Sequence, residues 1–271
     1  MATEDTEIRP STASETKPPN DAGPENETAP SQFRAFLSAI GISVVSMLLL
    51  GLWTVFLGAC YYALTGGIDK PTSLLLENLG LLLSAITLGL LFLQFSDHST
   101  DFYDFELPSV KQTLIGLGGA VVLLIASNGI AFIFQQFGIS GSQHAITQMA
   151  TGKNAVSPEF FLLLIPVSIF LIGPCEEFIY RNIVQKSLYP AFGKTYAILS
   201  TSIIFAAIHF PAYLTGTPGE AVITLLSVLA LSLVLGGVYA STEKLAVPAI
   251  AHGVYNAILF FVLYADLTNL M

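Results

Sequence analysis

Residues 160–185 read FFLLLIPVSIFLIGPCEEFIYRNIVQ, an apolar run that leads directly into two adjacent glutamates and an arginine. Apolar runs of about 20 residues are long enough to cross the hydrocarbon core of a bilayer as an α-helix. Ionisable side chains at membrane depth are costly, so they are candidates for function wherever they occur. This stretch therefore predicts a membrane-spanning helix and, at its polar end, the place to search for a site.

Similar apolar runs recur along the chain, which has 271 residues, 53% of them apolar and 11% charged. This composition is far from the average of soluble proteins, and the alternating pattern of membrane strands is absent from the sequence. We therefore expect an all-α fold, a polytopic transmembrane helical bundle of about seven to eight spans, in which a re-entrant segment would hide the eighth. The seven predicted spans are 35–64, 72–96, 113–137, 158–188, 195–210, 220–241 and 245–265.

The N-terminal residues 1–32 differ from the rest of the chain in being rich in Pro, Ser, Thr and acidic residues. Residues 1–30 contain seven acidic residues against Arg9 and Lys17, which gives −5 of the net charge of −9. A segment with so few aliphatic side chains cannot bury enough apolar surface to order itself. We therefore expect a disordered acidic tail over 1–32, followed by one membrane-embedded domain over 33–271. The acidic charge also argues against a nucleic-acid partner.

Lysine and arginine residues near the span ends predict the orientation, because cytoplasmic loops of membrane proteins carry an excess of them. With a cytoplasmic N-terminus, five such residues fall on the inner side and only Lys70 and Lys153 on the outer side. We therefore expect a multi-pass protein of the cell membrane, surrounded by lipid, with its N-terminus in the cytoplasm. The five inner residues are Arg34, Lys111, Lys186, Lys194 and Lys244.

Glu176, Glu177 and Arg181 form the first polar cluster inside a span. Glu177 and Arg181 are four residues apart, so they lie on one side of the helix and should form an ion pair. Glu176 points about 100° away from Glu177 around the helix. It needs a partner elsewhere, since an unpaired carboxylate in a dry interior is expensive.

His209, in the next span, is the partner that residue counting suggests for Glu176. Pro190 and Gly193 mark the turn between the two spans, and Glu176 and His209 are each about 21 Å from it at the rise of an α-helix. Both side chains should then lie at a similar depth. Phe205, one turn before His209, should pack beside it.

The third polar group is in the last span, where His252 and Asn256 are again four residues apart on one helix face. Gly253 and Ala257 beside them allow another helix to approach closely. A carboxylate and an imidazole together can deprotonate a water molecule. A second imidazole and an amide can donate hydrogen bonds to an oxyanion. These groups together suit the hydrolysis of an acyl bond such as a peptide bond.

The same side chains allow a second chemistry, because Zn²⁺ binds Glu and His and keeps one position open in catalytic sites. Glu176, His209 and His252 are the candidate ligands if a metal is bound, and zinc is then the candidate cofactor. The sequence does not choose between a metal-free and a metal-dependent site.

Three motifs carry a family resemblance: EExxxR at 176–181, FxxxH at 205–209 and HxxxN at 252–256. Their order within residues 170–260 resembles the CPBP family of intramembrane proteases, which includes CAAX prenyl proteases and the bacteriocin-processing or immunity proteins also called Abi proteins. The resemblance implies a helical membrane core with a cavity that opens toward the cytoplasm and into lipid. It also implies that Glu176 and His209 activate water, that His252 and Asn256 hold the oxyanion, and that Glu177, Arg181 and Phe205 support the site.

Three classes of function remain at this point. The first is an intramembrane endopeptidase of the CAAX-protease type, of glutamate or metallo chemistry, acting on a membrane-associated or lipidated peptide. The second is a non-catalytic immunity or scaffolding protein of the same family, in which the polar cluster would be structural. The third is a proton-coupled transporter, which also buries Glu and His, but the internal repeat typical of transporters is missing. The complete motif set favours the endopeptidase.

Overall fold

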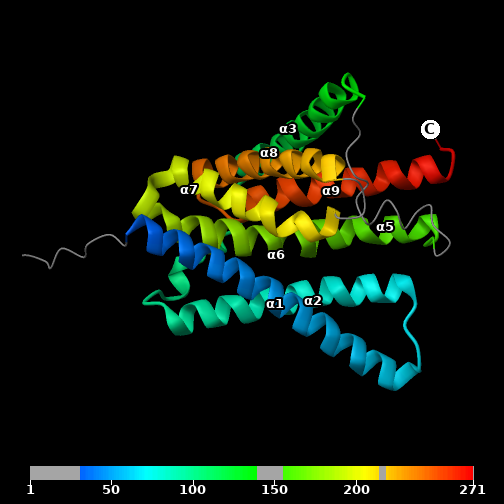
Figure 1. Ribbon diagram of the computed structural model, residues 1–271, viewed down its shortest axis with the longest axis horizontal. Coiled ribbons are helices and arrows are strands. Elements are labelled where there is room, and N and C mark those ends of the chain that lie inside the picture. The colour runs from blue at the N-terminus through cyan, green and yellow to red at the C-terminus, as the bar shows by residue number, and fades with distance from the viewer. Residues whose placement is uncertain (1–30, 139–154, 214–217, 271) are drawn as a thin grey trace, which may run out of the picture.

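The computed structural model describes residues 31–138, 155–213 and 218–270, and the regular elements in these ranges are all helices (Figure 1). The fold is therefore the all-α polytopic bundle that the sequence predicts. Six helices of the described chain are long and apolar enough to cross a membrane, and the total of seven to eight spans stays a prediction. The acidic tail up to residue 30, and Lys153, lie outside the described residues. Five of the six helices are α1 (Gln32–Thr65), α2 (Lys70–Phe95), α3 (Val110–Gln135), α8 (Pro218–Thr242) and α9 (Ala246–Leu267).

The sixth helical segment, Pro158–Tyr213, has 56 residues. As one straight helix it would measure about 80 Å, far more than the ~30 Å hydrocarbon core. It folds back at Gly193, whose φ of 66° lies in the left-handed region that favours glycine, whereas Pro190 stays inside the helix. The segment comprises α5 (Pro158–Val167), the π-helix η2 (Ser168–Ile172), α6 (Gly173–Glu177), the π-helix η3 (Phe178–Gln185), α7 (Lys186–His209) and the 3-10 helix η4 (Phe210–Tyr213).

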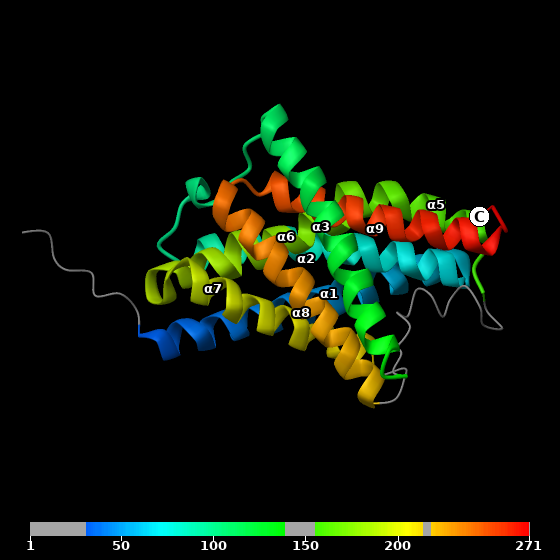
Figure 2. The same cartoon turned by 90° about the horizontal axis from the view of Figure 1, so that it is seen from above.

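The segment η3 lies at the centre of the bundle. The hairpin of α1 and α2 packs on one side of it, and α7 and α8 pack on the other (Figures 1 and 2). Helix α9 runs beside α5, η2 and α6, and α3 leans across α8 and α9. Large apolar side chains such as Leu48, Val55, Leu90 and Ile125 remain exposed on the outer helices. Such a surface is unfavourable in water and suits contact with lipid.

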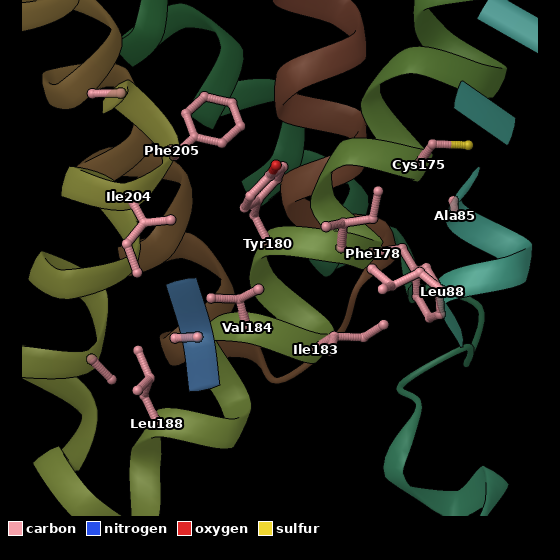
Figure 3. Packing of buried hydrophobic residues seen from close by; sticks show 14 of the residues in the cluster. Ala85, Leu88, Cys175, Phe178, Tyr180, Ile183, Val184, Leu188, Ile204 and Phe205 are labelled. Atoms are coloured by element: carbon pink, nitrogen blue, oxygen red, sulfur yellow. The ribbon is translucent and has the colours of Figure 1, made fainter. Parts of the chain in front are cut away.

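Side chains of the core meet around η3, in which all eight residues are buried. Phe178 and Ile183 lie near Leu88 of α2, and Tyr180 points toward Phe205 of α7 (Figure 3). The rings of Tyr180 and Phe205 meet edge to face, with their centroids 4.9 Å apart. This packing fixes the helix that carries the two glutamates against its neighbours.

The loop between α2 and α3 is held to the bundle by Asp104. Its Oδ2 accepts hydrogen bonds from Asn182 Nδ2 at 2.9 Å and from the Tyr239 hydroxyl at 2.5 Å, and its Oδ1 pairs with Lys186 Nζ at 2.8 Å. One carboxylate therefore joins the loop to η3, the start of α7 and α8. Because Asn182 is the neighbour of Arg181, this clamp lies directly behind the polar end of the site helix.

We expect Tyr239→Phe to lower the free energy of unfolding by about 1.5–3 kcal/mol, the range for a hydrogen bond to a charged group. The change removes the hydroxyl that donates to Asp104 and accepts from Asn182. Denaturant titration in detergent micelles measures the effect, with Tyr196→Phe as the control because the Tyr196 side chain is exposed. Equal stability of the two variants would contradict the clamp.

Candidate active site

Glu177 joins two of the three predicted motifs. Its Oε2 accepts from Arg181 Nε at 2.9 Å, which is the ion pair that the spacing predicts. Its Oε1 lies 2.9 Å from His252 Nδ1, a contact that sequence spacing does not predict. Glu177 and Arg181 are both fully buried. Since a carboxylate paired with a guanidinium only accepts hydrogen bonds, Nδ1 of His252 carries a proton and donates.

Glu176 faces the opposite nitrogen of the same imidazole. Its Oε2 is 3.9 Å from His252 Nε2, which is too long for a direct hydrogen bond. The Glu176 side chain keeps 20% of its surface accessible and that of His252 keeps 11%. His252 is therefore held through Nδ1 by Glu177 and presents Nε2 toward the partly accessible carboxylate of Glu176.

His209, at the C-terminal end of α7, has one ring nitrogen engaged, and the other makes no hydrogen bond to the described residues. Its Nδ1 donates to the Phe205 carbonyl at 2.7 Å, because a carbonyl oxygen can only accept. In the neutral ring the lone pair is then on Nε2. The Phe205 ring packs against the His209 ring with centroids 4.3 Å apart, as the FxxxH spacing predicts. The Arg181 guanidinium carbon lies 5.4 Å from the centroid of the same Phe205 ring.

Glu176, His209 and Asn256 are not hydrogen-bonded to one another within the described residues. Within the described residues, no hydrogen bond or ion pair joins Glu176 to His209, and the half-buried Asn256 makes no side-chain hydrogen bond. The depth count assumed regular α-helices, but π-helices flank Glu176 on both sides. Counting residues from the turn therefore places Glu176 and His209 in neighbouring helices but does not give the distance between them.

The irregularity before Glu176 has a cause in the sequence. Pro174 has no backbone N–H, and in a regular α-helix its ring would meet the carbonyl of Phe170, four residues earlier. The π-helix η2 contains Phe170 and ends one residue before Gly173. A wider turn at this place avoids that collision, and π segments in α-helices often occur at functional sites.

Two glycines bring the glutamate helix and the histidine helix together. A Cβ on Gly173 would lie 2.8 Å from the carbonyl oxygen of Ala249 and from the backbone nitrogen of Gly253. A Cβ on Gly253 would lie 2.8 Å from the Ser168 carbonyl oxygen. The backbones of η2, α6 and α9 are therefore in contact, as the glycine beside His252 predicts. This approach lets Glu177 reach His252.

We expect Gly253→Ala to destabilise the protein by about 1–3 kcal/mol, as overpacking does in other cores. The new methyl group meets backbone atoms that cannot move alone, so α9 must shift and carry His252 away from Glu177. Gly118→Ala on α3 is the matched control, because no atom lies within 4 Å of its Cβ position. Denaturant titration of both variants checks this, and a Gly253→Ala protein as stable as the control would refute the close approach.

Two serines contribute to the site that the motif analysis did not single out. Ser232 Oγ of α8 accepts from Arg181 Nη2 at 3.0 Å, and Ser46 Oγ of α1 lies 3.3 Å from the Tyr180 hydroxyl. Both serines are buried. A serine inside an apolar span is only weak evidence for a contact between helices, because most such serines form hydrogen bonds within their own helix.

The candidate metal ligands do not form a metal site in the described chain. No group of three His, Cys, Asp or Glu side chains there is arranged to hold a metal ion, whereas a catalytic zinc needs three protein ligands around one point. Nδ1 of His209 and of His252 are both engaged, which leaves Nε2 of each ring and is the usual state of a metal-bound histidine, so only the arrangement of the three side chains speaks against a metal. Glu176, His209 and His252 thus do not fit a zinc site in this arrangement, and no catalytic step is derived through a metal.

Comparison with known proteins agrees with the motifs. Residues 158–258 match the model of the family described as type II CAAX prenyl endopeptidase, Rce1-like. No curated protein and no solved structure is similar enough to the chain to count as a match. The matched range contains α5 to the middle of α9 and therefore the three motifs, with Glu176, Glu177, Arg181, Phe205, His209, His252 and Asn256. The protein is a multi-pass membrane protein, the matched family supports a peptidase, and residues 158–258 are similar to the Rce1-like CAAX endopeptidase family.

Proposed function

We propose that the protein is an intramembrane endopeptidase of the CAAX-protease type that hydrolyses a peptide bond in a membrane-associated or lipidated substrate. The observation that carries the proposal is the pair formed by Glu176 and His252 Nε2 at 3.9 Å. Behind this pair, His252 is fixed through Glu177 and Arg181. A carboxylate and a fixed imidazole that face each other at an accessible place in a bundle provide the groups that hydrolysis needs.

Water activation is assigned to Glu176 and His209. The partly exposed Glu176 carboxylate can take a proton from water, and Nε2 of His209 carries the lone pair needed for a second proton-accepting group. The resulting hydroxide attacks the carbonyl carbon of the substrate. The proton is later passed to the leaving amine, so the water is divided between the two products.

Oxyanion stabilisation is assigned to His252 and Asn256. When His252 carries both ring protons, its Nε2–H can donate to the oxygen that becomes negative. The negative charges of Glu176 and Glu177 are then balanced by the positive charges of Arg181 and His252. The cluster therefore has no net charge in a poorly solvated region. The Asn256 amide is on the same face of α9 and makes no other side-chain hydrogen bond in the described chain, so its N–H groups can donate to the same oxygen.

The surroundings of the substrate follow from the fold. A peptide attached to lipid, or embedded in it, can approach through the apolar outer surface of the helices, whereas a soluble globular protein cannot. We place the protein in the cell membrane with a cytoplasmic N-terminus, which puts Arg34, Lys111, Lys186, Lys194 and Lys244 on the inner side. Lipid is therefore the constant neighbour of the protein, and the substrate is a membrane-associated peptide.

The decisive experiment is mass spectrometry of membrane peptides from cells that carry either the wild type or the Glu176→Gln variant at equal abundance. We expect peptide termini that are present with the wild type and missing with the variant, which identifies both the activity and the substrate. Identical termini in the two samples, with a biological phenotype that persists in the variant, would instead favour a non-catalytic immunity or scaffolding role.

A further inference from the structure

Two buried polar atoms behind the site make no hydrogen bond to the described chain. Arg181 donates through Nε to Glu177 and through Nη2 to Ser232, but its Nη1 has no partner. Gln185, one turn later, donates through Nε2 to the Gly236 carbonyl at 3.1 Å and to the Tyr189 hydroxyl at 2.9 Å, but its Oε1 has no partner. Both side chains are fully buried. Unpaired buried polar groups are rare and costly.

The orientation of the Gln185 amide is fixed by its neighbours. A carbonyl oxygen can only accept, so the nitrogen of the amide must face Gly236. Turning the amide round would set two acceptors against each other at Gly236 and would place the nitrogen on the side of the Arg181 guanidinium. The unpaired oxygen therefore faces the same region as the unpaired Nη1.

Gly236 lies beside both of these atoms. A Cβ on Gly236 would lie 2.8 Å from Gln185 Oε1, 2.9 Å from Ile198 Cγ2 and 3.6 Å from Arg181 Nη1. One atom is an acceptor and the other a donor, and a small molecule that can both donate and accept would satisfy the two together. Water is the smallest such molecule, and buried waters typically bridge otherwise unsatisfied polar groups.

We propose that an internal water molecule binds between Arg181, Gln185 and Gly236, donating to Gln185 Oε1 and accepting from Arg181 Nη1. The water completes the hydrogen bonds of the guanidinium and so helps to hold Arg181 against Glu177, which in turn holds His252. The proposed water site does not depend on the proposed peptidase activity, because it is inferred only from the unpaired atoms of Arg181 and Gln185.

The neighbourhood provides further polar groups and a cavity beside Tyr189. Thr201 and Ser202 on α7 are buried, and their hydroxyls make no hydrogen bond to the described residues. They follow Ile198, which itself packs against Gly236, by three and four residues. They are therefore on the same side of α7 as Ile198. On the other side, Gln185 bonds to Tyr189, which lines a cavity of about 170 Å³. The other residues that line this cavity are Asp104, Lys186, Tyr239 and Glu243.

Two substitutions of Gly236 separate a water site from simple close packing. With Gly236→Ala, the methyl group displaces the water and satisfies neither polar atom, so the unfolding midpoint should fall. With Gly236→Ser, the hydroxyl can donate to Gln185 and accept from Arg181 in place of the water. We expect Ser to recover at least half of the midpoint loss caused by Ala, although Ser is larger and the weaker helix former.

Gly237 supplies the matched control, because no atom lies within 4 Å of its Cβ position. The Gly237→Ser variant should be no more stable than the Gly237→Ala variant. If Gly236→Ser is as unstable as Gly236→Ala, or less stable, Gly236 only provides room for close packing and the proposal fails.

A direct measurement tests the water in the unmodified protein. In X-ray hydroxyl-radical labelling after rapid mixing with ¹⁸O water, a bound water exchanges slowly and leaves ¹⁶O on Ile198, its apolar neighbour. We expect this delayed label in the wild type and its loss in Gly236→Ser. Absence of label at Ile198, or immediate exchange there, would overturn the proposal.

Discussion

Purified Glu176→Gln protein should cleave its substrate about 10²–10⁴-fold more slowly than the wild type, the usual contribution of a positioned acid–base group. Glutamine has the shape of glutamate but cannot take a proton from water at neutral pH. The peptide identified by its altered terminus in cells serves as the substrate, and the rate is measured in detergent or in proteoliposomes. The unfolding midpoint should change little, because the Glu176 side chain is partly exposed and makes no close hydrogen bond in the described chain.

Glu77→Gln is the control for this result. It makes the same chemical change on α2, where Glu77 is exposed on a membrane-spanning helix, so the cleavage rate should stay at the wild-type level. His209→Ala should reduce the rate by a similar order to Glu176→Gln, since both act on the same water. Wild-type rates in Glu176→Gln would remove the proposed mechanism.

The parts of the site that lie within one helix were predictable from the sequence. Glu177 with Arg181, and Phe205 with His209, are each four residues apart, so helix geometry alone brings them together. Both contacts are present in the structure. The apolar runs also locate the long helices to within a few residues, because the length of a span is set by the bilayer.

Contacts between helices were less predictable, because they depend on the rotation and register of each span. The bond from His252 to Glu177 requires the close approach at Gly173 and Gly253. Glycine near both motifs signals such an approach without saying which helices meet. The π-helices on either side of α6 also change which side chains face each neighbour, and only the proline before Glu176 hinted at one of them.

The clamp at Asp104 is the clearest example of a feature that the sequence concealed. Asp104 is in a polar loop that reads as an interfacial connection, and its partners are 78 or more residues away along the chain. Nothing in local spacing links them. Asn182 and Lys186 follow the EExxxR motif closely, however, so polar side chains just beyond a recognised motif are worth testing for partners in distant loops.

Replacement of Arg181 by methionine should have the largest effect on stability, about 3–5 kcal/mol, because it leaves the Glu177 carboxylate buried without its counter-charge. The side chain is fully buried and also loses its contact with the Phe205 ring and its hydrogen bond to Ser232. Denaturant titration in mixed micelles measures the free energy of unfolding. Cleavage should be lost as well, since His252 is held through Glu177.

A double variant separates the loss of a charge partner from the loss of packing. In Glu177→Gln with Arg181→Met, the glutamine oxygen can still accept from His252 Nδ1, and no uncompensated carboxylate remains. The double variant should therefore be more stable than Arg181→Met alone, which is the reverse of additive behaviour. Lys194→Met, which breaks the exposed pair with Glu243, should cost no more than about 1 kcal/mol. If Arg181→Met costs no more than Lys194→Met, or if the double variant is the least stable of the three, the buried ion pair does not hold the site together.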